Sequence, residues 1–272
     1  MTAPEPFYAG GTGTPMVLLH GFTDTWRTWK PVLPALEARH AVFAPSLPGH
    51  HGGEPFASGA PFTITASLDR LERQLDSRGI GQAHLVGNSL GGWAALELAS
   101  RGRALSVVAI CPGGGYDHGG PEERAVLRYF RNTERMLRAS KAMLPRIAKS
   151  PRLRRIAFRD LMARPGNVSA EDAQFFFDGA AGCSVYREAI ALSESGEAFG
   201  ELAPIECPVR ILYGTRDRII RWPSHYRRLK SMLPDAEYVP LHGLGHLPMW
   251  DDPDQVAHRI LEVSAPEAVT AA

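Results

Sequence analysis

The 272-residue sequence has little that would suit a secreted, membrane-spanning or nucleic-acid-binding protein. Its three cysteines, Cys111, Cys183 and Cys207, form no C-x-x-C pair, which disfavours a disulfide framework or zinc site and favours a reducing, cytoplasmic compartment. No apolar run approaches the ~20 residues that span a bilayer, and residues 1–6 lack a signal-peptide pattern. The formal net charge of +1 indicates no general attraction to nucleic acid.

An apolar content of 44% allows a sizeable core, and apolar runs alternate with helical patterns along most of the chain. Such an alternation predicts an α/β fold with a mostly parallel, doubly wound sheet. Gly10–Gly13 is expected to be a hairpin turn between N-terminal strands, and 264–272 a frayed tail. The expected strands cover 15–19, 40–45, 83–87, 104–110, 209–214 and 236–240, and the expected helices 63–78, 93–99, 223–232 and 254–263, with short pieces between the prolines of 27–39.

This rhythm stops between residues 113 and 200, where only helical segments are predicted. We therefore expect a core formed by residues 1–112 and 201–272, with a helical cap (113–200) inserted between its two parts. Thirteen Lys or Arg but only four Asp or Glu fall between 122 and 164. A solvated basic face on amphipathic helices would explain this excess, and a surface for an anionic substrate, an acidic carrier or an anionic membrane is the alternative.

The stretch 83–92, with the sequence AHLVGNSLGG, combines a short strand, a sharp turn and a helix start. Ser89 lies at the apex, and Gly87 and Gly91 flank it where side chains would crowd the turn and where unusual dihedrals are expected. Although G-x-S-x-G alone is a weak pattern, this context is typical of a nucleophile elbow, which holds a serine hydroxyl clear of the sheet. A glycine-rich turn with Ser89 as a helix N-cap is the structural alternative.

With this elbow the sequence resembles the α/β-hydrolase superfamily, which implies an α/β-hydrolase fold and a triad in the chain order serine, acid, histidine. Asp217 is the acid that the resemblance implies, because it lies three residues after Gly214 at the end of a predicted buried strand. His246, in the glycine-rich loop after the last predicted strand, is the matching base. His242 is its rival but lies closer to the strand end.

The resemblance also places an oxyanion hole at two backbone N–H groups, those of Leu90, directly after the serine, and of Phe22, directly after His20–Gly21. No cofactor or metal is implied, since the adjacent His50 and His51 have no carboxylate or cysteine at ligand spacing. Four further residues are candidate walls of the substrate pocket, with core packing as the alternative for each: Trp26, Trp93, Leu247 and Met249.

These residues predict a serine hydrolase that cleaves a carboxylic ester or thioester of a small, largely apolar substrate through an acyl-enzyme. Three alternatives stay open: carbon–carbon bond hydrolysis of a diketone, cofactor-free perhydrolysis, and a non-catalytic receptor on the same fold. The Gly-Asn-Ser-Leu-Gly-Gly elbow resembles that of meta-cleavage-product hydrolases, although their Gly-Pro-Gly after His20–Gly21 is missing. Epoxide hydrolases and haloalkane dehalogenases need aspartate at the apex, so Ser89 disfavours them. The sequence predicts no oligomeric state.

Overall fold

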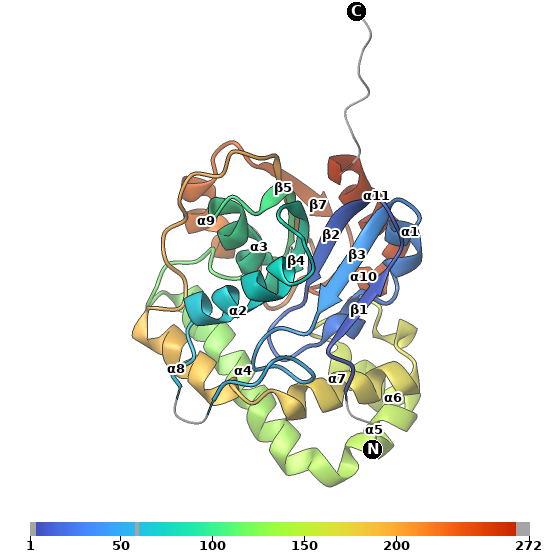
Figure 1. Cartoon of the computed structure of the whole chain (residues 1–272). Helices are drawn as coiled ribbons and strands as arrows, with labels where there is room; N and C mark the ends of the chain where they lie inside the picture. The colour runs from blue at the N-terminus through green and yellow to red at the C-terminus, as the bar shows by residue number, and fades with distance from the viewer. Residues whose placement is uncertain (1–3, 58–59, 265–272) are drawn as a thin grey trace, which may run out of the picture.

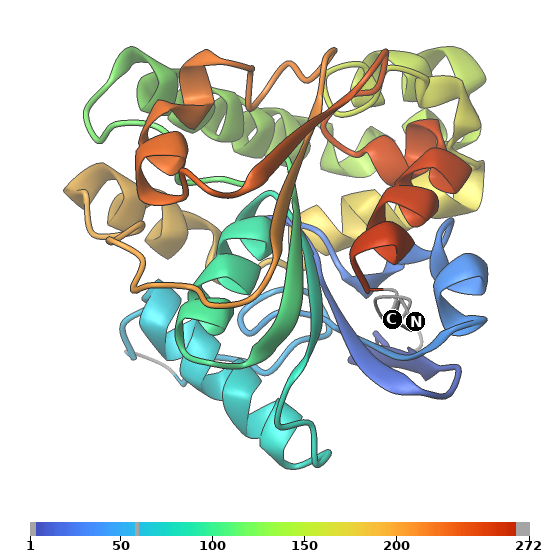
Figure 2. The same cartoon turned by 90° about the horizontal axis from the view of Figure 1, so that it is seen from above.

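The computed structural model describes residues 4–57 and 60–264, and within these ranges a seven-stranded sheet forms the centre of the fold (Figures 1 and 2). The strand order is β1-β3-β2-β4-β5-β6-β7, and every neighbouring pair is parallel except β1 with β3, so the predicted mostly parallel sheet is confirmed. The strands are β1 Phe7–Gly10, β2 Thr14–Leu19, β3 His40–Pro45, β4 Ala83–Asn88, β5 Ala104–Ile110, β6 Val209–Gly214 and β7 Glu237–Leu241.

Helices cover both faces of the sheet, which is why its central strands bury apolar side chains on both faces. Along β2, Val17 and Leu19 join the hydrophobic core under α2 (Ile64–Asp76) and α3 (Leu90–Ser100), whereas Met16 and Leu18 join the core under α1 (Leu33–Glu37) and α11 (Pro253–Ser264). The helices outside the cap are η1 Trp26–Trp29, α1 Leu33–Glu37, α2 Ile64–Asp76, α3 Leu90–Ser100, η4 Ser224–Tyr226, α9 Arg227–Met232, α10 Pro248–Asp251 and α11 Pro253–Ser264, where η marks a 3-10 helix.

The prediction of an N-terminal hairpin is wrong. Strand β1 pairs antiparallel with β3, with Phe7 opposite Pro45, and β2 lies on the other side of β3. The connection from β1 to β2 therefore passes the start of β3, where a Cβ at Gly11 would overlap the His40 carbonyl. Glycine permits this close crossing. Because a glycine-rich stretch also suits a hairpin turn, the sequence pattern does not distinguish the two kinds of connection.

Residues 113–200, the region predicted as a cap and called the cap below, contain helices and turns but no strand, and the structure describes all of them. Figure 1 shows the helices of the cap grouped together at one end of the sheet. Among the described residues, no helix combines the length and apolar character that crossing a membrane requires. The cap elements are α4 Pro121–Ser140, η2 Lys141–Met143, α5 Leu144–Lys149, α6 Pro151–Phe158, η3 Pro165–Asn167, α7 Ala170–Gly182 and α8 Tyr186–Ser195.

Candidate active site

Ser89 occupies a strained turn between β4 and α3. Its backbone angles, φ 55° and ψ −116°, lie in a region that residues with a side chain rarely adopt. A Cβ at Gly87 would overlap the Gly91 carbonyl, and one at Gly91 would overlap the carbonyls of Leu19 and His20. Crowding therefore requires both glycines, whereas the unusual dihedrals predicted for them belong to Ser89 itself. The turn sets the serine at the C-terminal end of a central strand, where open α/β sheets place their sites.

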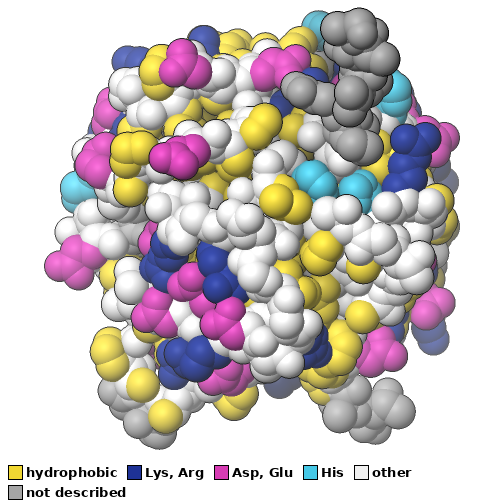
Figure 3. Space-filling view, turned by 45° about the horizontal axis from the view of Figure 1, so that its top comes forward, with side chains coloured by type: hydrophobic (Ala, Val, Ile, Leu, Met, Phe, Trp, Pro, Cys, Tyr) yellow, Lys and Arg dark blue, Asp and Glu magenta, His cyan; other side chains and the backbone are white. Residues whose placement is uncertain are grey.

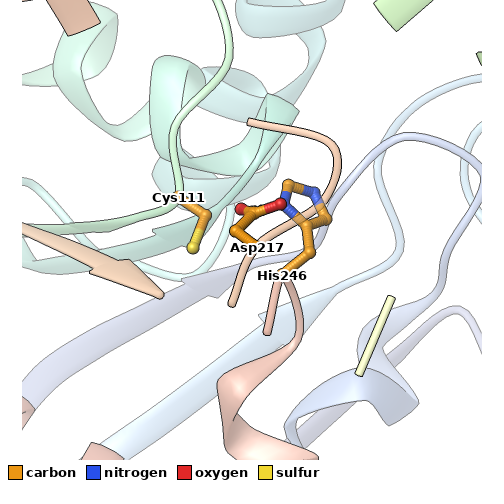
Figure 4. Close-up of side chains that lie close together, drawn as sticks. All are labelled: Cys111, Asp217 and His246. Atoms are coloured by element: carbon orange, nitrogen blue, oxygen red, sulfur yellow. Dashed lines mark hydrogen bonds and ion pairs between the residues drawn. The ribbon is translucent and has the colours of Figure 1, made fainter. Parts of the chain in front are cut away.

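Asp217 and His246 come from the loops after the neighbouring strands β6 and β7 and meet directly (Figure 4). His246 Nδ1 lies 2.7 Å from Asp217 Oδ2, and both side chains are buried. The other carboxylate oxygen accepts hydrogen bonds from the backbone N–H groups of Ile219 and Ile220 at 2.7 and 2.9 Å. This pairing favours the tautomer with the proton on Nδ1 and leaves Nε2 free to act as a base. The rival His242 is exposed to solvent.

Ser89 and His246 line the same cavity of about 360 Å³, whose wall comes largely from the cap. Within the described residues, no hydrogen bond joins the Ser89 hydroxyl to the imidazole ring. Catalytic hydrogen bonds of this kind are often long in the absence of substrate and tighten in the Michaelis complex. The structure thus gathers the three predicted triad residues at one cavity, with the pair of Asp217 and His246 already formed.

Two residues that the sequence analysis missed hold the histidine loop in place. The Asn88 side-chain amide donates a hydrogen bond to the backbone carbonyl of His246 at 3.0 Å, which joins this loop to the strand that carries the serine. Asp251 is 2% exposed, and its carboxylate accepts from the backbone N–H of Gly245 at 2.7 Å and from that of one cap residue at 2.6 Å. The position of Asn88 beside the serine was an available signal, whereas Asp251 belongs to no motif.

The loop after β2 lies against the elbow, as an oxyanion hole requires. A Cβ at Gly21 would come within 3.2 Å of the Ser89 Cβ, so glycine permits this approach. The backbone N–H groups of Phe22 and Leu90 donate to no described backbone carbonyl. His20 supports the loop, because its Nδ1 lies 2.8 Å from the Gly21 carbonyl and its Nε2 accepts from a backbone N–H at 2.8 Å. Burial holds the pKa of His20 well below its usual value, so the ring is neutral.

Ser89 and Phe22 line two cavities rather than one. The first is narrow, about 70 Å³, and almost entirely apolar. The second is the wider cavity of about 360 Å³, which also contains His246 and reaches the cap surface. The serine therefore borders both a narrow apolar space and a wider space that His246 also lines. Side chains that line the narrow cavity include Phe62, Ile64, Val126, Leu127, Ile190, Ala198 and Phe199.

Of the four residues predicted as pocket walls, Leu247 lines the wider cavity. Trp26, Trp93 and Met249 instead lie in the hydrophobic core, with exposed fractions of 7%, 1% and 0%, and line neither cavity beside the serine. Trp93, for example, packs edge-on against Phe199 and stands behind the cavity wall. We correct these three assignments to core packing, since apolar size alone does not separate a core residue from a wall residue.

Asp24 is a functional candidate that the sequence analysis missed. It is 8% exposed and lines the wider cavity with Ser89 and His246. Its Oδ1 accepts a hydrogen bond from the backbone N–H of Thr25 at 2.8 Å. Burial raises the pKa of this carboxyl to about 7, although the hydrogen bonds and the nearby His246 act in the opposite direction. Its place three residues after His20–Gly21 was the available signal, and only the fold reveals its burial.

Cys111 lies beside Asp217 and His246 (Figure 4), and potential ligand atoms of the three residues lie within 4.8 Å of one another. These residues do not fit a resident metal ion. Both Asp217 oxygens already accept hydrogen bonds, and burial raises the pKa of the Cys111 thiol well above its usual value, so the sulfur is not a thiolate ligand. The thiol accepts a hydrogen bond from the Gly214 backbone N–H instead. All three cysteines are free thiols.

Residues 16–259 match the sequence model of the alpha/beta hydrolase family. The chain therefore belongs to the alpha/beta hydrolase family and is a hydrolase. A curated relative is the epoxide hydrolase EphH of Mycobacterium tuberculosis, which is 32% identical over 193 residues, 71% of this chain and 90% of that protein.

Solved structures give the same fold. A thermophilic esterase from Thermogutta terrifontis superposes with a TM-score of 0.70 at 25% identity, over 94% of this chain and 91% of that one. A meta-cleavage product hydrolase from Pseudomonas fluorescens IP01 also superposes with a TM-score of 0.70, at 19% identity, over 95% of this chain and 93% of that one, and this likeness concerns the fold alone. The α/β-hydrolase fold expected from the elbow is confirmed.

Proposed function

We propose that the protein is a serine hydrolase that cleaves carboxylic esters or thioesters of small, largely apolar molecules. One observation carries the proposal: the 2.7 Å contact between Asp217 and His246 lies beside a cavity that Ser89 also lines. A serine hydroxyl needs a base whose pKa lies near neutrality, and a buried carboxylate orients that base and stabilises its cation. The three side chains supply these roles without a cofactor.

In the proposed reaction, Ser89 Oγ attacks the carbonyl carbon while His246 Nε2 takes the hydroxyl proton. The developing oxyanion accepts hydrogen bonds from the backbone N–H groups of Phe22 and Leu90, each worth about 3 kcal/mol in such sites. His246 then passes the proton to the leaving alcohol or thiol. Water attacks the acyl-enzyme by the same steps and releases the acid.

The two cavities suggest how an ester would lie. His246 must reach the leaving group to protonate it, so the leaving group belongs in the wider cavity, which the ring lines. The acyl group then enters the narrow apolar cavity on the other side of Ser89. Because that cavity has a volume of about 70 Å³, we expect a preference for acyl chains of a few carbons.

The relative named as an epoxide hydrolase gives a second candidate activity. The chemistry of Ser89 favours acyl transfer instead. A carboxylate that opens an epoxide forms an ester, which water can cleave, whereas a serine oxygen would form an ether without a carbonyl carbon for water to attack. Turnover of an epoxide through Ser89 would therefore stop after one cycle.

Labelling by a fluorophosphonate probe, combined with turnover of p-nitrophenyl acetate and of styrene oxide, tests the proposal. We expect labelling and ester turnover in the wild type, and a fall in kcat of at least about 10³-fold in Ser89→Ala. Circular dichroism of Ser89→Ala controls for folding. Diol formation from styrene oxide that survives Ser89→Ala, or a folded wild type that neither labels nor hydrolyses esters, would contradict the assignment.

A further inference from the structure

The cap exposes large apolar side chains at the mouth of the wider cavity. Met136 on α4 is 52% exposed and Ile156 on α6 is 59% exposed, yet both line the cavity together with Ser89. Leu153, which is 40% exposed, lies three residues before Ile156 and so shares its side of α6. Met143, at the end of η2, is 47% exposed. Single exposed apolar residues need no explanation, but a group of them on consecutive cap elements, two of which line the cavity, does.

Exposed cations without a partner among the described residues accompany these apolar residues. Arg135 precedes Met136 on α4, and on α6 Arg152 precedes Leu153 and Arg155 precedes Ile156. Of the thirteen Lys or Arg between 122 and 164, seven are exposed and form neither an ion pair nor a side-chain hydrogen bond with any described residue. These seven are Arg128, Arg135, Lys141, Arg146, Lys149, Arg152 and Arg155.

The positive charge is concentrated in the first part of the cap, residues 122–164, which includes the cavity-lining residues Met136 and Ile156. Between 165 and 200 the cap carries six Asp or Glu and one Arg, so its other part is acidic. Two of these acids pair with cations from elsewhere: Asp172 with Lys30, and Glu194 with Arg131. A general excess of basic residues therefore does not explain the unpaired cations of α4, η2, α5 and α6.

We propose that this surface, made of α4, η2, α5 and α6, binds an anionic membrane so that the mouth of the wider cavity meets the bilayer. Anionic head groups would neutralise the unpaired cations, and the exposed apolar side chains would enter the interface between head groups and acyl chains. An acidic protein would neutralise only the cations and would leave the exposed apolar side chains without a partner. Met136 and Ile156 stand where a bilayer could release an apolar ester directly into the cavity. This delivery step rests on the proposed function, whereas membrane binding does not.

Sedimentation with lipid vesicles tests the proposal on the full chain. Two vesicle types are compared, one of phosphatidylcholine and one of equal parts phosphatidylcholine and phosphatidylglycerol. The test variant, Arg152→Glu/Leu153→Ser/Arg155→Glu, changes α6 at residues that line no catalytic cavity. A matched control, Arg39→Glu/Arg73→Glu/Leu105→Ser, makes the same changes at exposed residues of the core.

We expect the wild type to bind the anionic vesicles, to release them at high salt and to bind neutral vesicles much more weakly. The partition coefficient of the cap variant should be at least about tenfold lower than that of the wild type, whereas that of the core control should not fall in this way. Equal binding by the two variants, or no binding of anionic vesicles by the wild type, would overturn the proposal, and the second result would point to an acidic protein instead. Hydrolysis of water-soluble p-nitrophenyl acetate, measured in parallel, separates this proposal from the catalytic one: vesicle binding without ester hydrolysis would contradict only the latter.

Discussion

The core and the cap use their charged residues differently. In the core, Arg101 lies 2.8 Å from Asp69 and 2.7 Å from Glu72, and Arg210 pairs with two acids in the same way. Figure 3 turns the end opposite the cap toward the viewer and shows basic and acidic side chains close together. In the cap, seven exposed cations have no described partner. These core cations therefore support the fold itself, whereas the seven cap cations remain available for something outside it.

The same division holds for the candidate site. The proposed reacting groups, Ser89, Asp217 and His246, lie on loops at the ends of core strands, and hydrogen bonds between side chains and backbone groups hold the loops of Asp217 and His246. The cap contributes much of the cavity wall, through side chains that form no hydrogen bond with these groups among the described residues. We infer that changes in the core alter the chemistry, and that changes in the cap alter which molecules reach it.

The largest effect is expected for the acid of the triad. Asp217→Asn should lower kcat for p-nitrophenyl acetate by about 10³- to 10⁴-fold, because the amide favours the wrong tautomer of His246. A cap acid at the same cavity, Asp160, provides the comparison, since it pairs with Arg218 and touches no group of the triad. Asp160→Asn should change kcat less than about threefold. A similar loss in both variants would break the division between core and cap.

A smaller effect, on stability, is expected from Asp24. Its native pKa of about 7 exceeds the usual 3.8. Between these two pH values the native state therefore holds a proton that the unfolded state has lost. The stability that this proton provides is complete below about pH 4 and falls by about 1.4 kcal/mol per pH unit up to about pH 7.

Asp24→Asn removes this dependence, so the variant should gain stability relative to the wild type as the pH rises from 5 to 8. Urea unfolding at both pH values measures the difference. A gap between the two proteins that stays constant with pH would show that the carboxyl is ionised throughout.

An effect of about tenfold is expected from filling the narrow cavity. Ala198→Leu should lower kcat/KM for p-nitrophenyl hexanoate about tenfold more than for the acetate, because longer acyl chains lose their space. Ala180→Leu, in the wider cavity, makes the same change beside the leaving group. It should leave the ratio of hexanoate to acetate within about twofold. A larger shift of this ratio in Ala180→Leu than in Ala198→Leu would reverse the assignment of the two cavities.

Local patterns were enough to predict the sheet and the elbow. Strands such as β3 and β5 are apolar on both faces, and the crowded turn at Ser89 leaves glycine as the residue that fits at 87 and 91. The pairing of strands that are distant in the sequence could not be predicted from local patterns. Nothing in residues 7–19 indicates that β1 crosses to the far side of β3, because that outcome depends on contacts with a later strand.

The walls of the site were also hidden from the sequence. Trp93 and Leu247 are both large and apolar, and only the packing of the cap and core decides that one is core and the other faces the cavity. The burial of Asp24 is not visible in the sequence although its place after His20–Gly21 is, and Asp251 belongs to no motif at all, since its partners include cap residues far along the chain. Motifs describe local chemistry, whereas burial belongs to the whole fold.

The smallest effect compares a paired core cation with an unpaired cap cation. Arg101 is 24% exposed in its side chain and touches three acids, so Arg101→Met should lower the free energy of unfolding by about 0.5–1 kcal/mol. This loss should shrink in 1 M salt, where such contacts are screened. Arg128→Met, at an exposed residue of α4 without a described partner, should change it by less than about 0.3 kcal/mol. Urea titrations of the two variants give both numbers. If Arg128→Met cost as much as Arg101→Met, the cap cation would already serve the fold, and the argument that such cations are free for an external partner would fail at this residue.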